Sequence, residues 1–214
     1  PRERIYFQPE RTRAAIVTCG GLCPGLNDVI RSVFLELVMN YGVRHVLGIR
    51  YGYQGLNDQV GVPPIDLTMN MVEDIHREAG TILGSSRGAQ DPSVMVDFLV
   101  QRDINNLFCV GGDGTQRGTH AIHEEVHRRG LDIAIVGIPK TIDNVIPYCE
   151  QSFGFVTAVT EAQKAIDCAH AESKGVPYGI GLVKLMGREA GFITAIAAVA
   201  SQDVNFTLVP ELPF

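Results

Sequence analysis

The sequence predicts an α/β fold with a doubly wound, mainly parallel, Rossmann-like sheet, followed by the start of a second α/β domain. Short apolar, β-rich runs alternate with helical stretches along most of the chain. The runs are continuously apolar, as in strands that are buried on both faces. Several of them end in glycine-rich turns. This alternation indicates βαβ units, whose right-handed crossovers place the loops after the strands along one sheet edge, where such folds bind ligands.

The elements follow one another at regular intervals. The expected strands comprise residues 14–18, 45–49, 81–84, 106–110, 132–137, 180–185 and 206–209. The expected helices comprise residues 25–39, 71–78, 93–102, 115–129, 156–171 and 188–201. We expect a polar N-terminal arm and a boundary that divides residues 1–154 from residues 155–214. Because the chain lacks an initial Met and stops just after its last expected strand, we expect either a fragment of a longer protein or a natural short form.

Composition narrows the class of protein. The 214 residues are 45% hydrophobic and 20% charged, as in ordinary globular domains. The net charge of −6 argues against a broad nucleic-acid or anionic-membrane surface, and no apolar run reaches the roughly 18 residues of a membrane span. The cysteines are odd in number and scattered, which fits a reducing cytoplasm. They are Cys19, Cys23, Cys109, Cys149 and Cys168.

The most informative motif is the run Gly-Gly-Asp-Gly-Thr at residues 111–115, between an expected strand and an expected helix. Glycines allow close backbone approach to a ligand, and a helix N-terminus favours phosphate. Asp113 adds a carboxylate where an anionic ligand is expected, so a magnesium ion between the two is indicated. The alternative is a tight strand–helix turn with Asp113 near its cap. The spacing matches neither the dinucleotide fingerprint nor a P-loop.

Two further turns resemble this one. Gly20 and Gly21 follow the first expected strand, and Arg87 follows the third within a glycine-flanked segment. Taken alone, the first is a plain glycine turn as readily as a ligand site, and Arg87 is more often solvated. Because one sheet edge is expected to collect all three turns, we predict a polyphosphate site there, with Arg87 pairing to phosphate.

Polar residues after the later strands suggest an acceptor site. Asp143 follows the fifth expected strand and is a candidate proton acceptor for phosphoryl transfer, with Lys140 beside it to offset phosphate charge. The alternative is an Asx turn. Arg188 stands at an expected helix start, where a cation opposes the helix dipole, so it is predicted to bind an anionic substrate. Glu211 is a candidate for sugar hydroxyls, although a solvated acid is the simpler interpretation.

One motif points to different chemistry. His123 and His127 match the HExxH pattern of zinc proteases. The stretch is almost wholly polar, and no third ligand follows at a recognisable spacing. We therefore expect a solvated helix face there, without zinc.

Together these motifs resemble the phosphofructokinase family, in particular the ATP-dependent 6-phosphofructokinases of plants and trypanosomes. The resemblance covers nearly all of the chain. It rests on residues 17–27, 51–56, 80–88, 111–118, 139–144, 152–155, 184–188 and 209–211. It implies a cytoplasmic glycolytic enzyme that uses Mg²⁺ and moves the γ-phosphoryl group of ATP to the 1-hydroxyl of fructose 6-phosphate. It also implies a homo-oligomer, either a tetramer or a dimer.

The resemblance also implies roles for individual residues. The nucleotide would be bound within residues 1–154 by Gly20, Tyr53, Arg87, Gly88, Gly112, Asp113, Gly114, Thr115 and Gly118, with Asp113 holding the metal. The sugar phosphate would be bound by Thr141, Ile142, Asp143, Met186, Gly187, Arg188 and Glu211, and residues 155–214 would begin its domain. The catalytic residues would be Asp143, Thr141 and Arg188.

Three positions bear on the donor and the rate. Relatives that use pyrophosphate carry aspartate where Gly114 stands, so Gly114 indicates ATP, whereas Lys140 is usual in pyrophosphate enzymes. The plant-like ATP group combines both residues. Val145 replaces a second aspartate of the family pattern, which predicts lowered activity. A non-catalytic regulatory paralogue and a pyrophosphate-dependent enzyme are the alternatives.

Overall fold

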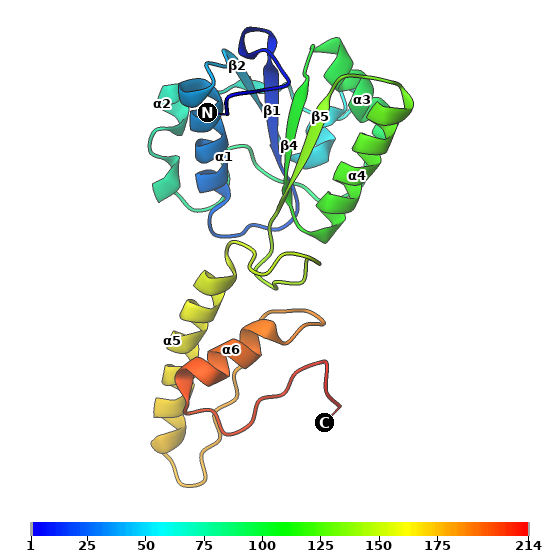
Figure 1. Ribbon diagram of the computed structural model, residues 1–214. Helices are drawn as coiled ribbons and strands as arrows, with labels where there is room; N and C mark the ends of the chain where they lie inside the picture. Colours follow the sequence, from blue (N-terminus) through cyan, green and yellow to red (C-terminus); the bar gives the residue numbers. More distant parts are fainter. Residues whose placement is uncertain (1, 214) are drawn as a thin grey trace. The chain divides into compact units, whose positions relative to one another are not determined.

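The structure, a computed structural model, describes residues 2–213, and the chain divides into two compact units (Figure 1). The first unit comprises Pro1–Lys140 and the second Thr141–Phe214. The division therefore falls earlier than the boundary expected after residue 154, because the loop that follows the last strand of the sheet belongs to the second unit.

The first unit contains a five-stranded sheet in the order β3-β2-β1-β4-β5. The strands are β1 (Arg13–Thr18), β2 (His45–Ile49), β3 (Ile65–Asp66), β4 (Asn106–Gly111) and β5 (Ala134–Pro139). All pairings are parallel except that of β2 with β3. The expected mainly parallel sheet is thus confirmed.

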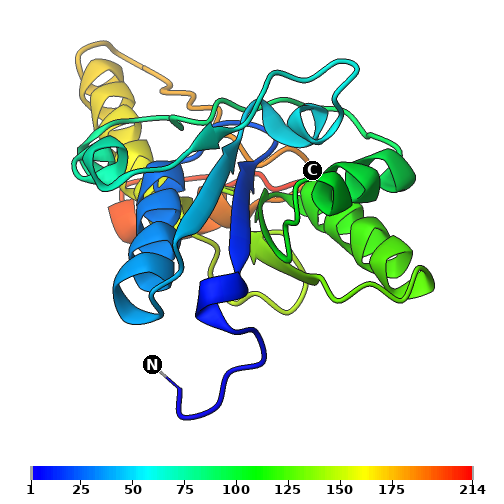
Figure 2. The same cartoon turned by 90° about the horizontal axis from the view of Figure 1, so that it is seen from above.

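Helices cover both faces of this sheet. They are α1 (Leu26–Leu35), α2 (Met69–Val72), α3 (Pro92–Gln101) and α4 (Asp113–Arg128), with a π-helical turn at Glu36–Asn40 and 3-10 turns η1 (Pro9–Arg11), η3 (Gly52–Leu56) and η4 (Ile75–Arg77). In Figures 1 and 2, α1 lies against one face and α3 and α4 against the other. The doubly wound arrangement is confirmed. The residues of β1 after Arg13 are buried, which explains their continuously apolar sequence.

Two expectations for the first unit were wrong. Residues 81–84 form a turn instead of a strand, because Gly84 adopts a positive φ of 66° that takes the backbone out of the extended region. The segment crosses the end of the sheet, where the backbone N–H of Tyr51 donates to the carbonyl of Leu83 (2.9 Å). The short antiparallel strand β3 carries no strong sequence signal and was missed.

The second unit is helical where its structure is regular. It contains α5 (Phe155–Lys174) and α6 (Phe192–Ser201), which share a small apolar cluster that includes Ile166, Ile193 and Ala197. The strands expected at residues 180–185 and 206–209 are absent from the described residues. Several of their apolar side chains lie in solvent, with Ile180 91% exposed and Phe206 86% exposed, whereas Leu185 packs against the α5/α6 cluster. An apolar β-rich run forms a strand only beside a partner strand, and the described part of this unit offers none.

Within residues 2–213, no helix combines the length and the apolar character needed to cross a bilayer.

Candidate active site

The predicted site lies at the switch point of the sheet, where β1 and β4 are neighbours while their chain connections lead in opposite directions. Doubly wound sheets bind ligands beyond the carboxyl ends of such strands. The register pairs Thr18 with Val110 and Gly111 with Pro139, so the ends of β1, β4 and β5 are level. The turns that follow these strands therefore begin side by side.

The turn at residues 80–88 is joined by hydrogen bonds to the turn at residues 19–27. The Ser85 hydroxyl donates to the Gly20 carbonyl (2.6 Å), and the Gly20 N–H donates to the Ser86 carbonyl (3.0 Å). A side chain built on Gly21 would meet the guanidinium of Arg87 at 3.3 Å, so that cation lies over the first turn. The three turns do gather at one edge, as the sequence predicts. Contacts of Gly20, Arg87 and Gly88 with a ligand stay predictions.

Lys140 places a second cation among these turns. Its side chain is only 6% exposed, and its ammonium donates to the Gly21 carbonyl (2.6 Å). Its backbone N–H donates to the Gly111 carbonyl (2.9 Å), which fixes the residue directly beside the start of α4. A buried ammonium in such a position attracts anions, because little water intervenes to screen it.

The first turn of α4 presents an anion-binding helix end with a carboxylate attached. Gly112 is the N-cap and has no side chain to cap the helix, so the first N–H groups face outward. Asp113 begins the helix, and its side chain is 52% exposed. Its carboxylate pairs with the guanidinium of Arg117 one turn later (2.6 Å). Asp113 is therefore accessible to a metal ion. Binding the ion would break only an exposed ion pair, which contributes little to the stability of the protein.

The glycines around this turn fall into two groups. A Cβ added to Gly111 would clash with the Thr115 side chain, and one added to Gly118 would lie 2.5 Å from the Tyr53 ring. These two glycines are required by packing. A Cβ added to Gly114 would meet no protein atom within 4 Å, and the same holds for Gly88. Gly114 therefore borders open space that the fold does not use.

Two further side chains contribute to this edge; Gln116 was not predicted from the sequence, and Tyr53 was predicted with a different contact. The side-chain amide of Gln116 donates to the carbonyls of Gly111 (2.9 Å) and Ile138 (3.1 Å), so it joins the ends of β4 and β5. In the sequence, the glycine at position 137 is the feature that could have indicated this contact, because any larger side chain there would clash with Gln116. Tyr53, expected beside the nucleotide, is 5% exposed and bonds to α4 instead. A direct contact of Tyr53 with a nucleotide stays a prediction.

In the second unit, the loop that carries Asp143 is closed by its own polar groups. The Asp143 N–H donates to the Thr141 hydroxyl (3.0 Å). Asn144, at a positive φ of 57°, accepts from the Ser152 N–H (2.8 Å), and the Ser152 hydroxyl bonds to the Thr141 carbonyl. Asp143 Oδ1 is the one buried side-chain oxygen or nitrogen in the described residues without a hydrogen-bond partner. A carboxylate oxygen left in that state is available to accept a proton.

The other predicted acceptor residues meet at the start of α6. A side chain on Gly187 would clash with the Ala190 carbonyl, and Arg188 has a positive φ of 57°, which is uncommon for a residue with a side chain. Arg188 precedes α6, so the expected helix start at residue 188 was wrong. The Glu211 carboxylate accepts from the Gly191 N–H (2.8 Å), which places residue 211 beside the N-cap of α6. Substrate contacts of Met186, Gly187, Arg188, Ile142 and Glu211 stay predictions.

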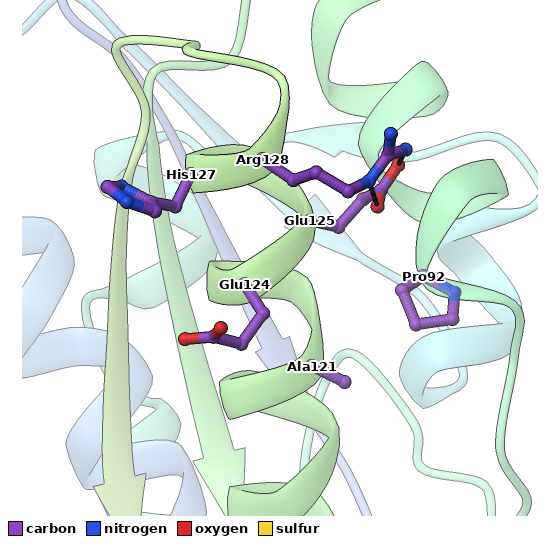
Figure 3. A pocket seen from close by; sticks show the side chains of 6 residues that line it. All are labelled: Pro92, Ala121, Glu124, Glu125, His127 and Arg128. Atoms are coloured by element: carbon purple, nitrogen blue, oxygen red, sulfur yellow. Dashed lines mark hydrogen bonds and ion pairs between the residues drawn. The ribbon is translucent and has the colours of Figure 1, made fainter.

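Within the HExxH stretch, Glu124, Glu125 and His127 are among the residues of α4 that line an open hollow beside Pro92 of α3 (Figure 3), whereas Val126 is buried in the core. The rings of His123 and His127 stack with their centroids 6.5 Å apart. Glu125 is tied to Arg128 (2.6 Å), and hydrogen bonds from Arg128 and Arg129 lower the pKa of Glu125 to about 2. No group of three or more potential His, Cys, Asp or Glu ligands converges anywhere in residues 2–213.

Comparison with known proteins decides the family. A model of the family described as phosphofructokinase matches residues 13–214. The chain belongs to the phosphofructokinase family. It is 54% identical over its whole length to the ATP-dependent 6-phosphofructokinase of Borreliella burgdorferi and covers 48% of that protein. It is 55% identical to that of Trypanosoma cruzi and 52% identical to ATP-dependent 6-phosphofructokinase 7 of Arabidopsis thaliana, covering all of this chain and 44% of each relative.

Solved phosphofructokinases share the fold. The Pichia pastoris phosphofructokinase in the T-state matches 95% of this chain with a TM-score of 0.79 at 20% identity, over 22% of its own chain. A pyrophosphate-dependent phosphofructokinase from Marinobacter aquaeolei matches 95% of this chain with a TM-score of 0.77 at 23% identity, over 54% of its own chain. This phosphofructokinase chain spans about half the length of the curated relatives that it matches.

Proposed function

We propose that the protein transfers the γ-phosphoryl group of ATP to the 1-hydroxyl of fructose 6-phosphate, giving fructose 1,6-bisphosphate in glycolysis. The observation that carries this proposal is the gathering of three glycine-rich turns and the buried Lys140 around the open space beside Gly114. The names of the relatives, all ATP-dependent 6-phosphofructokinases, support the same reaction.

On the donor side, the N–H groups at the start of α4 and the cations Arg87 and Lys140 bind the phosphates. Asp113 suits Mg²⁺, because it offers an exposed carboxylate beside the expected phosphate position. When bound, the metal neutralises charge on the transferring phosphoryl group. For Asp113 to hold the ion, its ion pair with Arg117 would have to open, which would leave the Arg117 guanidinium available to the phosphates.

On the acceptor side, Asp143 accepts the proton of the 1-hydroxyl as its oxygen attacks the γ-phosphorus. The bond to the β–γ bridging oxygen breaks, and ADP leaves with that oxygen. Thr141 orients Asp143 through the backbone hydrogen bond described above. Met186, Gly187 and Arg188 bind the sugar phosphate, Arg188 by its charge, and Glu211 binds sugar hydroxyls.

The donor is ATP and not pyrophosphate, for a steric reason. Gly114 borders space that the protein leaves open, and a carboxylate side chain there would enter it. Lys140 is compatible with either donor, because its positive charge offsets the negative charge of the phosphate groups in both. The ATP-dependent names of relatives with more than half of their aligned residues in common favour the same choice.

Val145 bears on the turnover rate of the protein and on whether it is a regulatory paralogue. Its side chain is 42% exposed, so aspartate fits there without burying a charge. We expect Val145→Asp to raise turnover, by adding a carboxylate near Asp143 that helps to arrange metal and substrate. Unchanged turnover would remove Val145 as the cause of any low activity. Cytoplasmic location and a dimeric or tetrameric homo-oligomer complete the proposal, although one curated relative is named as chloroplastic.

A coupled assay tests the reaction. The whole protein is supplied with fructose 6-phosphate and either ATP or pyrophosphate, and ADP or phosphate release is followed. Turnover with ATP and none with pyrophosphate is the expected result. Turnover with pyrophosphate alone contradicts the donor assignment, and binding of ATP without turnover identifies a regulatory paralogue.

A further inference from the structure

Tyr53 connects a remote part of the chain to the first turns of α4. It lies in η3, and its hydroxyl donates to the Thr115 carbonyl (2.7 Å) across 62 residues of sequence. The same hydroxyl lies 2.9 Å from the Thr119 hydroxyl. Thr119 in turn donates to the Thr115 carbonyl (2.9 Å). Three oxygen atoms, two of them from α4, thus form one buried cluster.

The ring of Tyr53 is fitted to this position by a glycine. Gly118 lies between Thr115 and Thr119 in sequence, and a Cβ on it would lie 2.5 Å from Tyr53 Cε2. The sequence therefore reserves space on α4 for the aromatic ring. With the ring against Gly118 and the hydroxyl on Thr115, Tyr53 contacts the helix at two points.

The cluster is uncharged. Burial raises the pKa of the Tyr53 hydroxyl well above its ordinary value. Burial also raises the pKa of the neighbouring Cys109 thiol to about 11 and that of Cys19 to about 12. The Tyr53 hydroxyl is therefore uncharged, and it donates its proton to the Thr115 carbonyl, which fits a role in holding the backbone of α4.

The first turn of a helix is held less firmly than its centre, because its N–H groups have no partners within the helix. Here that turn carries Asp113 and Gly114. We infer that Tyr53 is a positioning residue, which fixes the first turn of α4 for the phosphates through Thr115, Thr119 and Gly118. This inference rests on the proposed function, which places the nucleotide phosphates at the first turn of α4.

Hydroxyl-deletion variants of the 214-residue chain test this role. Tyr53→Phe removes the hydroxyl and keeps the ring against Gly118. Thr119→Val removes the second hydroxyl at constant shape, and Thr119→Ser restores it. Thr160→Val is the matched control, because its hydroxyl makes the same kind of bond within α5, to the Val156 carbonyl (2.9 Å).

Two measurements are made on each variant. The first is hydrogen exchange of the amides of residues 113–117 without ligand. We expect about 2- to 10-fold faster exchange for Tyr53→Phe and Thr119→Val, the effect of losing one hydrogen bond. The second is calorimetric titration with Mg²⁺ and ATP, in which the dissociation constant rises by a similar factor. The double variant falls short of the product of the single effects, because both hydroxyls serve one cluster.

The inference is supported if amide exchange becomes faster and ATP affinity becomes weaker together in Tyr53→Phe and Thr119→Val, while Thr119→Ser and Thr160→Val behave like the wild type. Unchanged exchange in Tyr53→Phe overturns it, and so does faster exchange with unaltered ATP affinity. If the wild-type chain binds no ATP, the proposed donor site fails and the positioning role for a nucleotide fails with it. Exchange data still decide whether Tyr53 holds the helix.

Discussion

Replacing Gly114 with alanine should change stability and ligand affinity in opposite directions. Gly114 is the second residue of α4, its φ is not positive, and a Cβ there would meet no protein atom within 4 Å. The methyl group therefore causes no clash in the free protein. It does enter the open space assigned above to the nucleotide phosphates.

The two effects have different magnitudes. Alanine at a helical position that tolerates it stabilises a protein by about 0.4–1 kcal/mol, because the unfolded chain loses conformational freedom. For a chain of this size, that raises the Tm by about 1–4 °C. A methyl group forced into a filled contact costs about 1–3 kcal/mol, so the ATP dissociation constant should rise by roughly tenfold or more.

Thermal unfolding without ligand and calorimetric titration with Mg²⁺ and ATP measure both effects. Gly118→Ala is the matched comparison, because its Cβ would press on the Tyr53 ring at 2.5 Å and should lower the Tm. If Gly114→Ala binds ATP as tightly as the wild type, the space beside Gly114 does not hold the nucleotide. A lowered Tm in Gly114→Ala would show that the fold needs this glycine.

Three further predictions follow from other contacts. Glu125→Gln should destabilise the protein near pH 7, because hydrogen bonds from two arginines lower the pKa of Glu125 in the folded protein to about 2. The difference in unfolding free energy between wild type and variant should shrink as the pH falls below about 4.5. Urea unfolding at several pH values measures this difference. Ser152→Ala should lower kcat of the whole protein more than it changes KM for ATP, since it frees the Thr141 carbonyl in the loop that carries the proton acceptor, and equal changes in both constants would contradict this. Lys140→Met should weaken ATP binding by on the order of tenfold, since it removes a buried cation that now bonds to Gly21, and unchanged affinity in calorimetry would show that Lys140 serves only the fold.

Local sequence patterns were sufficient to predict the sheet of the first unit. The strands β1, β2 and β4 are largely buried apolar runs, and β5 is an apolar run that is half-buried or exposed; each is bounded by turn residues, and such runs leave few alternatives. The glycine-rich turns were also predictable, because packing requires glycine at Gly111, a positive φ favours it at Gly20, and close approach of a ligand favours it at Gly114. Parallel pairing then places the turns at one edge, and the hydrogen bonds of Gly20 with Ser85 and Ser86 agree with that.

Other features depend on contacts between residues far apart in the sequence. The runs at 180–185 and 206–209 have strand-like composition, but strands form only by pairing, and their described surroundings provide no partner. Likewise, nothing local distinguishes Gly118, which packs on Tyr53, from Gly114, which borders open space. Gln116 was missed for the same reason, since its bond to Ile138 joins two strands that are distant along the chain.

The central claim is that the turn at residues 111–115 binds ATP through a metal held by Asp113. Titration of the wild-type chain and Asp113→Asn with ATP, each with and without Mg²⁺, tests it most directly. We predict that the substitution weakens ATP binding strongly in the presence of Mg²⁺. Without the metal it should leave binding unchanged or improve it, because it removes a negative charge near the phosphates. Equal affinity of both proteins for ATP in the presence of Mg²⁺, or no binding by either, would contradict the account.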